Sequence, residues 1–119
     1  MKYILLIHQG DAPTPRDPEA WERLPENERN AVFADYQAIN QTPGVSPGLQ
    51  LSEPGTATTV RVQDGRTLTT DGPFVAVKEA LAGYLLFDAD DLDAAIELAA
   101  RVPAARLGGA VEVRPIVER

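Results

Sequence analysis

Hydrophobic and polar residues follow two different periods along the 119-residue chain, and the changes of period mark its elements. Residues 2–9 read KYILLIHQ, a short apolar run of β-forming residues, and residues 81–89 read LAGYLLFDA. Such runs are typical of strands with apolar side chains on both faces. Residues 108–116, GGAVEVRPI, alternate apolar and polar positions as a half-buried strand does. The pattern therefore predicts three strands.

A helical period appears first in residues 26–41, ENERNAVFADYQAINQ. The predicted helix has an apolar face made of Val32, Tyr36 and Ile39, with Phe33 beside it. The sequence Thr-Pro-Gly at residues 42–44 ends this helix.

A second helix is predicted within residues 88–103, DADDLDAAIELAARVP. An aspartate caps its start, and Pro103 stops it. The apolar residues at helical spacing are Leu92, Ile96 and Ala99.

The remaining segments carry turn signals. Residues 10–25, GDAPTPRDPEAWERLP, hold four prolines and predict a loop with one short helix, opened by Asp17 as N-cap and Pro18 in its first turn. Residues 49–53, LQLSE, are a candidate strand. Asp64-Gly65 between two β-rich runs in residues 58–70 predicts a hairpin with a type I′ turn.

The element order is strand, helix, strand, hairpin, strand, helix, strand, which predicts one α+β domain over residues 1–119. This order is typical of a split βαβ arrangement with two helices on one face of an antiparallel sheet. The other sheet face would be bare, yet the first strand and the LLF run of residues 85–87 carry apolar residues on both sides. We therefore expect a homodimer in which a second copy covers that face.

Composition narrows the function classes. The chain has 44% hydrophobic and 24% charged residues, as soluble domains do, and a formal net charge of −7, so no nucleic acid is expected as a partner. Without cysteine it has neither disulfide nor thiolate. The apolar run Tyr3 to Ile7 is too short for a signal peptide, and no run has membrane-spanning length. We expect a cytoplasmic protein that does not contact membranes.

Several segments, in order and spacing, resemble the YCII-related domain family in its DGPF branch: MKYILLI, ATTVRV with DGR, TTDGPFVAVKE, LAGYLLFDADDLDAAIELAARVPAA and GAVEVRPI. The resemblance implies a ferredoxin-like dimeric α+β barrel in which two sheets pack face to face. The wider superfamily includes small-molecule isomerases and dehalogenase-like enzymes, and the DGPF branch often occurs beside alternative sigma factors. The better-studied branch is thought to use a His on the first helix and an Asp just after it. Residues 26–43 contain no His, and the helix exit Asn40-Gln41-Thr42-Pro43 has no acid, so this dyad is not carried over.

His8 is the single histidine and the side chain whose ordinary pKa lies nearest neutrality, so acid–base chemistry would recruit it first. The alternative is that His8 only ends a strand. Asp71 likewise has two interpretations, as a catalytic carboxylate or as a residue that holds the Asp-Gly-Pro turn. Both interpretations stay open.

Three residues are candidates for substrate binding. Phe74 and Lys78 follow the turn, and neither an aromatic ring nor the Lys78-Glu79 pair is needed to form it. That pair can equally be a solvated ion pair. Trp21 lies in the long loop and covers either a pocket mouth or the dimer contact.

The acids at residues 88–93 suit helix capping better than metal binding, and no cofactor or metal signature is present. The first hypothesis is an enzyme that performs acid–base chemistry on a small polar organic molecule, in a cleft between the first helix, residues 9–24 and the DGPF loop. The alternatives are a non-enzymatic module that senses a small molecule or binds a partner in transcription regulation, and a purely structural interaction domain.

Overall fold

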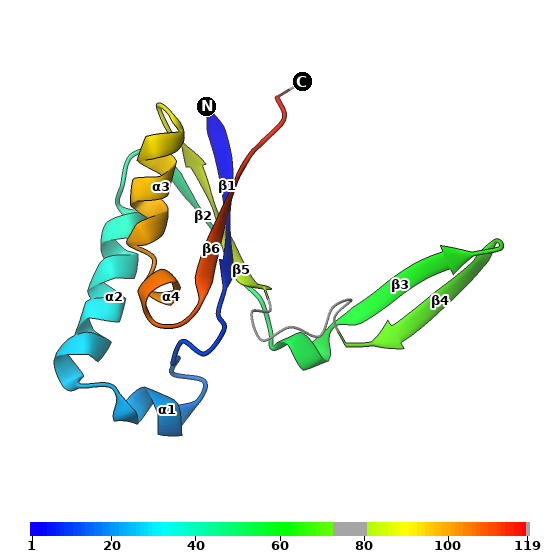
Figure 1. Cartoon of the computed structure of the whole chain (residues 1–119), viewed down its shortest axis with the longest axis horizontal. Coiled ribbons are helices and arrows are strands. Elements are labelled where there is room, and N and C mark those ends of the chain that lie inside the picture. The colour runs from blue at the N-terminus through cyan, green and yellow to red at the C-terminus, as the bar shows by residue number, and fades with distance from the viewer. Residues whose placement is uncertain (73–80, 119) are drawn as a thin grey trace.

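The computed structural model describes residues 1–72 and 81–118 of the chain (Figure 1). Its strands are β1 (Lys2–His8), β2 (Val45–Gln50), β3 (Thr58–Gln63), β4 (Arg66–Asp71), β5 (Leu81–Asp88) and β6 (Ala110–Pro115). Its helices are α1 (Pro18–Arg23), α2 (Glu26–Asn40), α3 (Leu92–Ala100) and α4 (Pro103–Arg106), with a 3₁₀ turn η1 (Pro54–Thr56). The predicted α+β class is confirmed.

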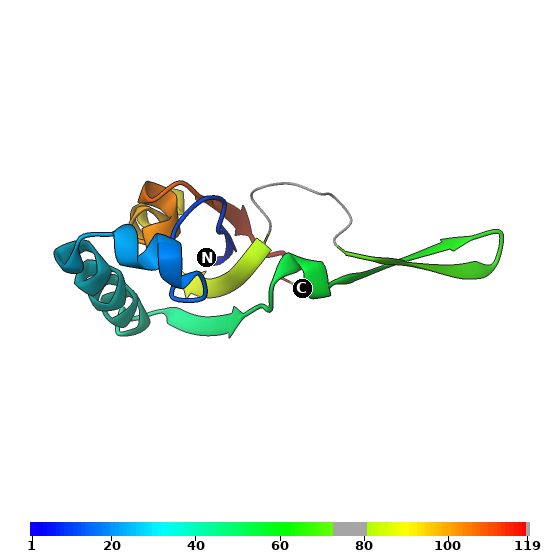
Figure 2. The same cartoon turned by 90° about the horizontal axis from the view of Figure 1, so that it is seen from below.

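Four strands form one sheet in the order β2-β5-β1-β6, and every neighbouring pair is antiparallel. The strands predicted within residues 2–9, 81–89 and 108–116 are present as β1, β5 and β6. The helices gather on one side of this sheet (Figures 1 and 2). The two faces of the sheet therefore have different surroundings.

The core lies between the helices and one sheet face. Tyr3, Leu5 and Ile7 of β1 are buried there, and Leu5 pairs in register with Leu85 of β5. The alternate residues of β1 point to the other face and are only half-buried. Ile39 of α2 and Leu98 of α3 complete the core with no more than 1% exposure each. We call this unit of sheet and helices the body.

The capping residues act as the sequence predicts. The Asp17 side chain accepts a hydrogen bond from the Ala20 amide at 3.3 Å, and Asp91 accepts one from the Ala94 amide at 2.8 Å. Each satisfies an amide that would otherwise lack a partner in the first turn of its helix. Among the described helices, none has both the length and the apolar character needed to cross a membrane.

The predicted apolar positions of α3 are only partly buried. Leu92 and Ile96 are 48% and 50% exposed, whereas Ala99 is buried together with Ala95 and Leu98. The α3 helix ends at Ala100, before Pro103, as predicted. Pro103 in turn starts the short helix α4, where a proline in the first turn loses no helical hydrogen bond.

The α4 helix is tied to α2 through Arg106. Its guanidinium donates to Glu28 Oε1 at 2.8 Å and to Asp35 Oδ2 at 2.7 Å. The hydrogen bond to Glu28 is the main cause that raises the pKa of Arg106 above its ordinary value. The guanidinium therefore stays charged and bridges the two helices.

The second strand differs from the sequence expectation, because β2 covers Val45–Gln50 rather than residues 49–53. It includes Pro47, which an edge strand tolerates because the outward amide needs no partner. It also includes Gly48, where a Cβ would lie 2.1 Å from the Tyr84 carbonyl oxygen. Glycine thus allows β2 to lie close against β5.

The strands β3 and β4 pair only with each other among the described strands, and we call this hairpin the arm. Its turn has φ of 52° at Asp64 and 75° at Gly65, which confirms the predicted type I′ hairpin. The arm projects away from the body (Figures 1 and 2). The radius of gyration is accordingly 16.3 Å, against about 13.5 Å for a compact chain of this length.

Candidate functional site

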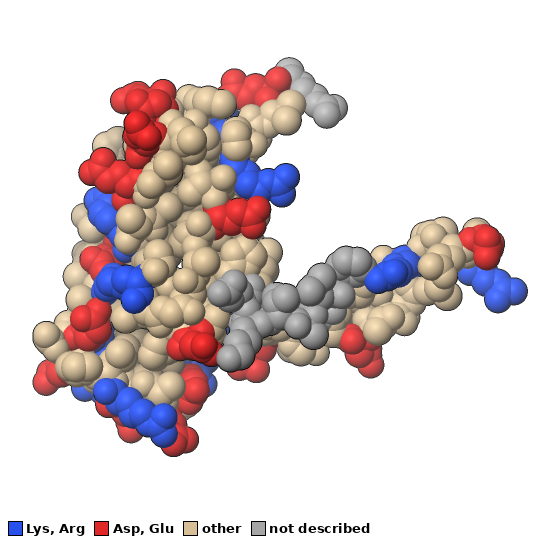
Figure 3. Space-filling view, in the orientation of Figure 1, with Lys and Arg blue, Asp and Glu red and all other residues tan. Residues whose placement is uncertain are grey.

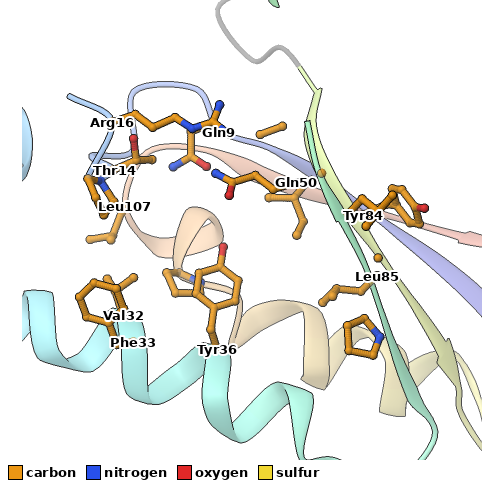
Figure 4. A pocket seen from close by; sticks show the side chains of 18 of the residues that line it. Gln9, Thr14, Arg16, Val32, Phe33, Tyr36, Gln50, Tyr84, Leu85 and Leu107 are labelled. Carbon is orange, nitrogen blue, oxygen red and sulfur yellow. The ribbon is translucent and has the colours of Figure 1, made fainter. Parts of the chain in front are cut away.

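A cavity of about 470 Å³ lies between α2, the loop after β1 and the ends of β2 and β5 (Figure 4). It lies on the side of the sheet that the helices cover. This position fits two of the three boundaries predicted for a cleft, namely the first helix and the loop of residues 9–24. The volume is in the range of small-molecule sites.

The cavity wall is mainly apolar. Trp21 of α1 and Phe33 of α2 meet edge to face, with ring centroids 5.6 Å apart and an interplanar angle of 74°. Val32, Leu85 and Leu107 add aliphatic surface from α2, β5 and the segment after α4. Such a wall favours a ligand with an apolar body.

Polar groups converge on the same space from three elements. The side chains of Gln9, Tyr36 and Gln50 point into the cavity in Figure 4. Gln9 Nε2 donates to the Ala12 carbonyl at 3.0 Å, which holds that amide in place. Within the described part of the chain, the side chains of Tyr36 and Gln50 form no hydrogen bond with protein atoms. Their donors and acceptors are therefore available to a ligand.

Tyr36 is a neutral hydrogen-bonding group at physiological pH. Burial raises the pKa of its phenol above the ordinary value of 10.0. The hydroxyl can thus donate or accept a hydrogen bond, but it does not act as a base near neutral pH.

Arg16 is the single charged residue among the described residues that line the cavity. Its Nη1 donates to the Leu51 carbonyl at 3.1 Å, which links the loop to the segment after β2. Arg16 also lines a second hollow of about 230 Å³, together with Gln9, Thr14 and Gln50. The two spaces share a polar border that carries the positive charge of Arg16, and the second hollow is also lined by Asp17 and Glu53.

The loop that forms the cavity rim is held by backbone hydrogen bonds. The Ala12 amide donates to the Gln9 carbonyl at 3.0 Å, and the Asp17 amide donates to the Thr14 carbonyl at 3.0 Å. Pro13 and Pro15 line the cavity between these contacts. The backbone of the rim is thus held by hydrogen bonds within the loop itself.

His8 lies elsewhere. It ends β1 on the sheet face that the helices leave bare, and it is not among the lining residues of either space. Its Nε2 is 3.4 Å from Glu112 Oε1 of the neighbouring strand β6, and its side chain is 24% exposed. This is a histidine–carboxylate pair on the surface of the body.

Asp71 is the exposed last residue of β4, opposite Thr58 at the base of the arm, and it lines neither space. Gly72 follows with φ of +96°, a conformation that suits glycine, and its amide donates to the Ala57 carbonyl at 2.7 Å. Phe74 and Lys78 lie outside the described residues. Trp21, the third predicted substrate-binding residue, does line the cavity.

Sequence reasoning missed Gln9, Gln50 and the cavity-facing position of Tyr36. The face of α2 that carries Tyr36 was predicted, but its apolar neighbours suggested packing alone. Gln50 had no usable signal, because β2 was placed three to four residues too late. Within residues 1–72 and 81–118, no three His, Asp or Glu side chains gather where they could hold a metal ion.

The model of the YCII-related domain matches residues 1–119. The chain belongs to the YCII-related domain family. An uncharacterized protein from Rhizobium meliloti (strain 1021) is 32% identical over 121 residues, covering 98% of this chain and 92% of that protein. This YCII-related chain thus matches that relative along nearly its whole length, including the segments that form the cavity and the arm.

Proposed function

We propose that this YCII-related protein binds a small amphipathic organic molecule in the cavity beneath its sheet. The observation that carries the proposal is the set of free polar groups in an apolar space, where Tyr36 and Gln50 face inward without partners in the described part of the chain. A ligand with an apolar body and one polar end would satisfy both kinds of surface. Binding of this kind serves a sensor directly and is also the first step of an enzyme.

The chemistry of the border favours an anionic polar end. Arg16 supplies the one positive charge among the described lining residues, and amide groups of Gln9 and Gln50 can donate hydrogen bonds beside it. A carboxylate accepts such hydrogen bonds, and charge-assisted bonds of this type are stronger than neutral ones. An organic monocarboxylate is the ligand class that fits best.

Acid–base catalysis near the DGPF loop is the second candidate function. The His8–Glu112 pair favours it, since a carboxylate 3.4 Å from an imidazole can orient the ring. In this proposal His8, on the bare sheet face, and Asp71, at the base of the arm, act as the catalytic groups. Phe74 and Lys78 lie outside the described residues and stay candidates for substrate binding from the sequence alone. The ligand would then occupy a different place from the cavity beneath the sheet.

The proposal also includes the DGPF branch of the family and a homodimeric assembly. The Asp-Gly-Pro-Phe run at residues 71–74 supports the DGPF branch, and the strand order β2-β5-β1-β6 supports a ferredoxin-like arrangement.

The face of the sheet that the helices leave bare has an apolar surface, made by half-buried Ile4 and Leu6 and by Leu86, which is 37% exposed. A homodimer with its two sheets face to face would cover them. Static light scattering is its test: twice the monomer mass is expected, and a stable monomer at all concentrations would reject it.

A thermal-shift screen tests the binding proposal. The screen compares aromatic and short aliphatic monocarboxylates with their amides and with amines of the same shape. A carboxylate at one hundred times its dissociation constant should stabilise the protein by about 2.7 kcal/mol. The acids should outperform the amides and amines.

Variants locate the site. Arg16→Gln and Tyr36→Phe should weaken binding of a carboxylate hit, while Arg23→Gln should not, because Arg23 lies on the neighbouring helix α1 and outside the cavity lining. His8→Asn separates the two candidate functions. Binding that depends on His8 but not on Arg16 or Tyr36 would reject the cavity and favour the bare face.

A further inference from the structure

The arm has two chemically different faces, which follow from its register. Val60 pairs with Thr69 and Val62 with Thr67, so these four side chains lie on one face of the hairpin. We call them the Val–Thr face. The opposite face consists of the remaining paired residues between the base and the turn, namely Thr59, Arg61, Gln63, Arg66, Leu68 and Thr70. The pair Thr58 and Asp71 at the base lies on the same side as the Val–Thr face, so this side is β-branched and uncharged only beyond its base, and the other side carries both arginines of the arm.

The Val–Thr face has no partner surface within the described chain. Val60 is 59% exposed and Val62 is 68% exposed, although valine is among the residues most often buried in folded proteins. A two-stranded hairpin is only marginally stable in water, and a long uncovered strand edge invites pairing with another chain. Both facts indicate that another molecule covers the arm.

The place of the arm limits what that molecule can be. It leaves the body on the side of the sheet that the helices do not cover (Figures 1 and 2). The sheet on that side presents Ile4, Leu6 and Leu86, and the Tyr84 ring points away from the cavity in Figure 4. A partner that covers this sheet face therefore lies in the angle between the sheet and the arm, and it can contact both surfaces.

A second copy of the chain fits this angle. It brings the same sheet face and the same arm, so a two-fold arrangement covers the sheet face and the Val–Thr face of both copies at once. Charge supports this choice over a nucleic acid, since the chain carries −7 overall. The arm, residues 58–71, holds two Arg and two Asp and is neutral, so it can lie on an acidic copy without the repulsion that other parts of the surface would add. Figure 3 shows charges of both signs on the arm.

We propose that the arm of each copy crosses to the other copy and packs its Val–Thr face on the partner's body. The inference rests on the homodimer proposed above and goes beyond it, because the sheet faces could meet while the arms stay free. The two crossing arms then hold the two bodies in one relative orientation.

Single cysteines test this proposal cleanly, because the chain has none of its own. Val62→Cys places a thiol on the Val–Thr face, and Gln63→Cys places one on the opposite face of the same strand. Val60→Cys and Thr70→Cys form a second matched pair. Circular dichroism confirms that each full-length variant is folded, and light scattering gives its mass under the labelling conditions.

A docked arm predicts unequal labelling. Thiols at positions 60 and 62 should react more slowly than those at positions 63 and 70, by about tenfold or more, because they must first leave a contact. Dilution below the dimer dissociation constant should make the rates converge. A photoreactive group attached to the thiol of the Val62→Cys variant should cross-link two copies, and mixing isotope-labelled with unlabelled chain should yield mixed products.

Each alternative has its own signature. Equal labelling rates in a sample with dimer mass would overturn the crossing arm and leave the sheet-face dimer standing. A stable monomer with equal rates would overturn both. Protection that persists in a monomer, with cross-links only inside one chain, would show that the arm folds back on its own body and would likewise overturn the proposal.

Discussion

The body and the arm are built from equally regular strands, but they differ in what stabilises them. In the body, Leu5, Ile39, Leu98 and Val102 have at most 1% of their surface exposed. In the arm, every β4 residue is exposed, and so is all of β3 except Thr59. Local sequence can therefore specify a strand and its turn even where neither is buried by the rest of the described chain.

The largest expected effect concerns the core of the body. Leu98→Ala should lower the free energy of unfolding by about 2–5 kcal/mol, because it leaves a cavity under a side chain that is 1% exposed. Leu92→Ala on the same helix is the matched control and should cost well below that, since Leu92 is 48% exposed. Urea denaturation measures both. Equal losses would contradict the assigned face of α3.

A change in the arm turn should act locally. Gly65→Ala puts a Cβ on a residue with φ of 75°, which costs about 1–2 kcal/mol in a left-handed conformation. Amide hydrogen exchange should speed up in β3 and β4, while the β1 and β5 amides keep their protection. Faster exchange throughout the sheet would show that the arm and the body unfold together.

Asp71→Asn tests the residue that joins the two regions. Asn keeps the size and one acceptor oxygen, so a residue that only holds the turn should lose about 1 kcal/mol or less of stability. Binding of a carboxylate in the cavity should not change, because Asp71 does not line it. Melting temperature and affinity are measured together. A large loss of affinity with an unchanged melting temperature would instead make Asp71 a site residue.

The smallest expected effect is a pH dependence in the body. Burial raises the pKa of Tyr36 above 10.0, so the folded state holds its proton more tightly than the unfolded state. The stabilising contribution of the neutral phenol is complete below about pH 10 and is lost as pH rises through the raised value. Tyr36→Phe should therefore lose less stability than the wild type in that alkaline range. Parallel losses in the two proteins would contradict this burial effect.

Elements with strong local signals were predicted well. Asp64-Gly65 fixed the hairpin turn, and Asp17-Pro18 fixed the start of α1, because both depend on backbone preferences of neighbouring residues. The start of β2 was missed because Pro47 and Gly48 oppose strand formation locally, and only pairing with β5 makes them acceptable. On α3, Ala99 is buried as its spacing indicated, but Ala95 and Leu98 rather than Leu92 and Ile96 are buried with it.

The candidate cavity was only partly predictable for a related reason. Its polar groups come from residues 9, 36 and 50, which the fold brings together from a strand end, a helix and an edge strand. Each has an ordinary role in its own segment, and no local spacing links them. Trp21 was found because a large aromatic in a long loop is conspicuous by itself.

The proline-containing rim affects the thermodynamics of any ligand that enters the cavity. Pro13 and Pro15 restrict φ, and the hydrogen bonds from Ala12 to Gln9 and from Asp17 to Thr14 restrict the backbone around them. A loop that is already ordered gives up little conformational entropy when a ligand binds, so more of the contact energy remains as affinity. The cavity is therefore suited to select a ligand by shape, because its rim is preorganised and does not have to rearrange when the ligand binds.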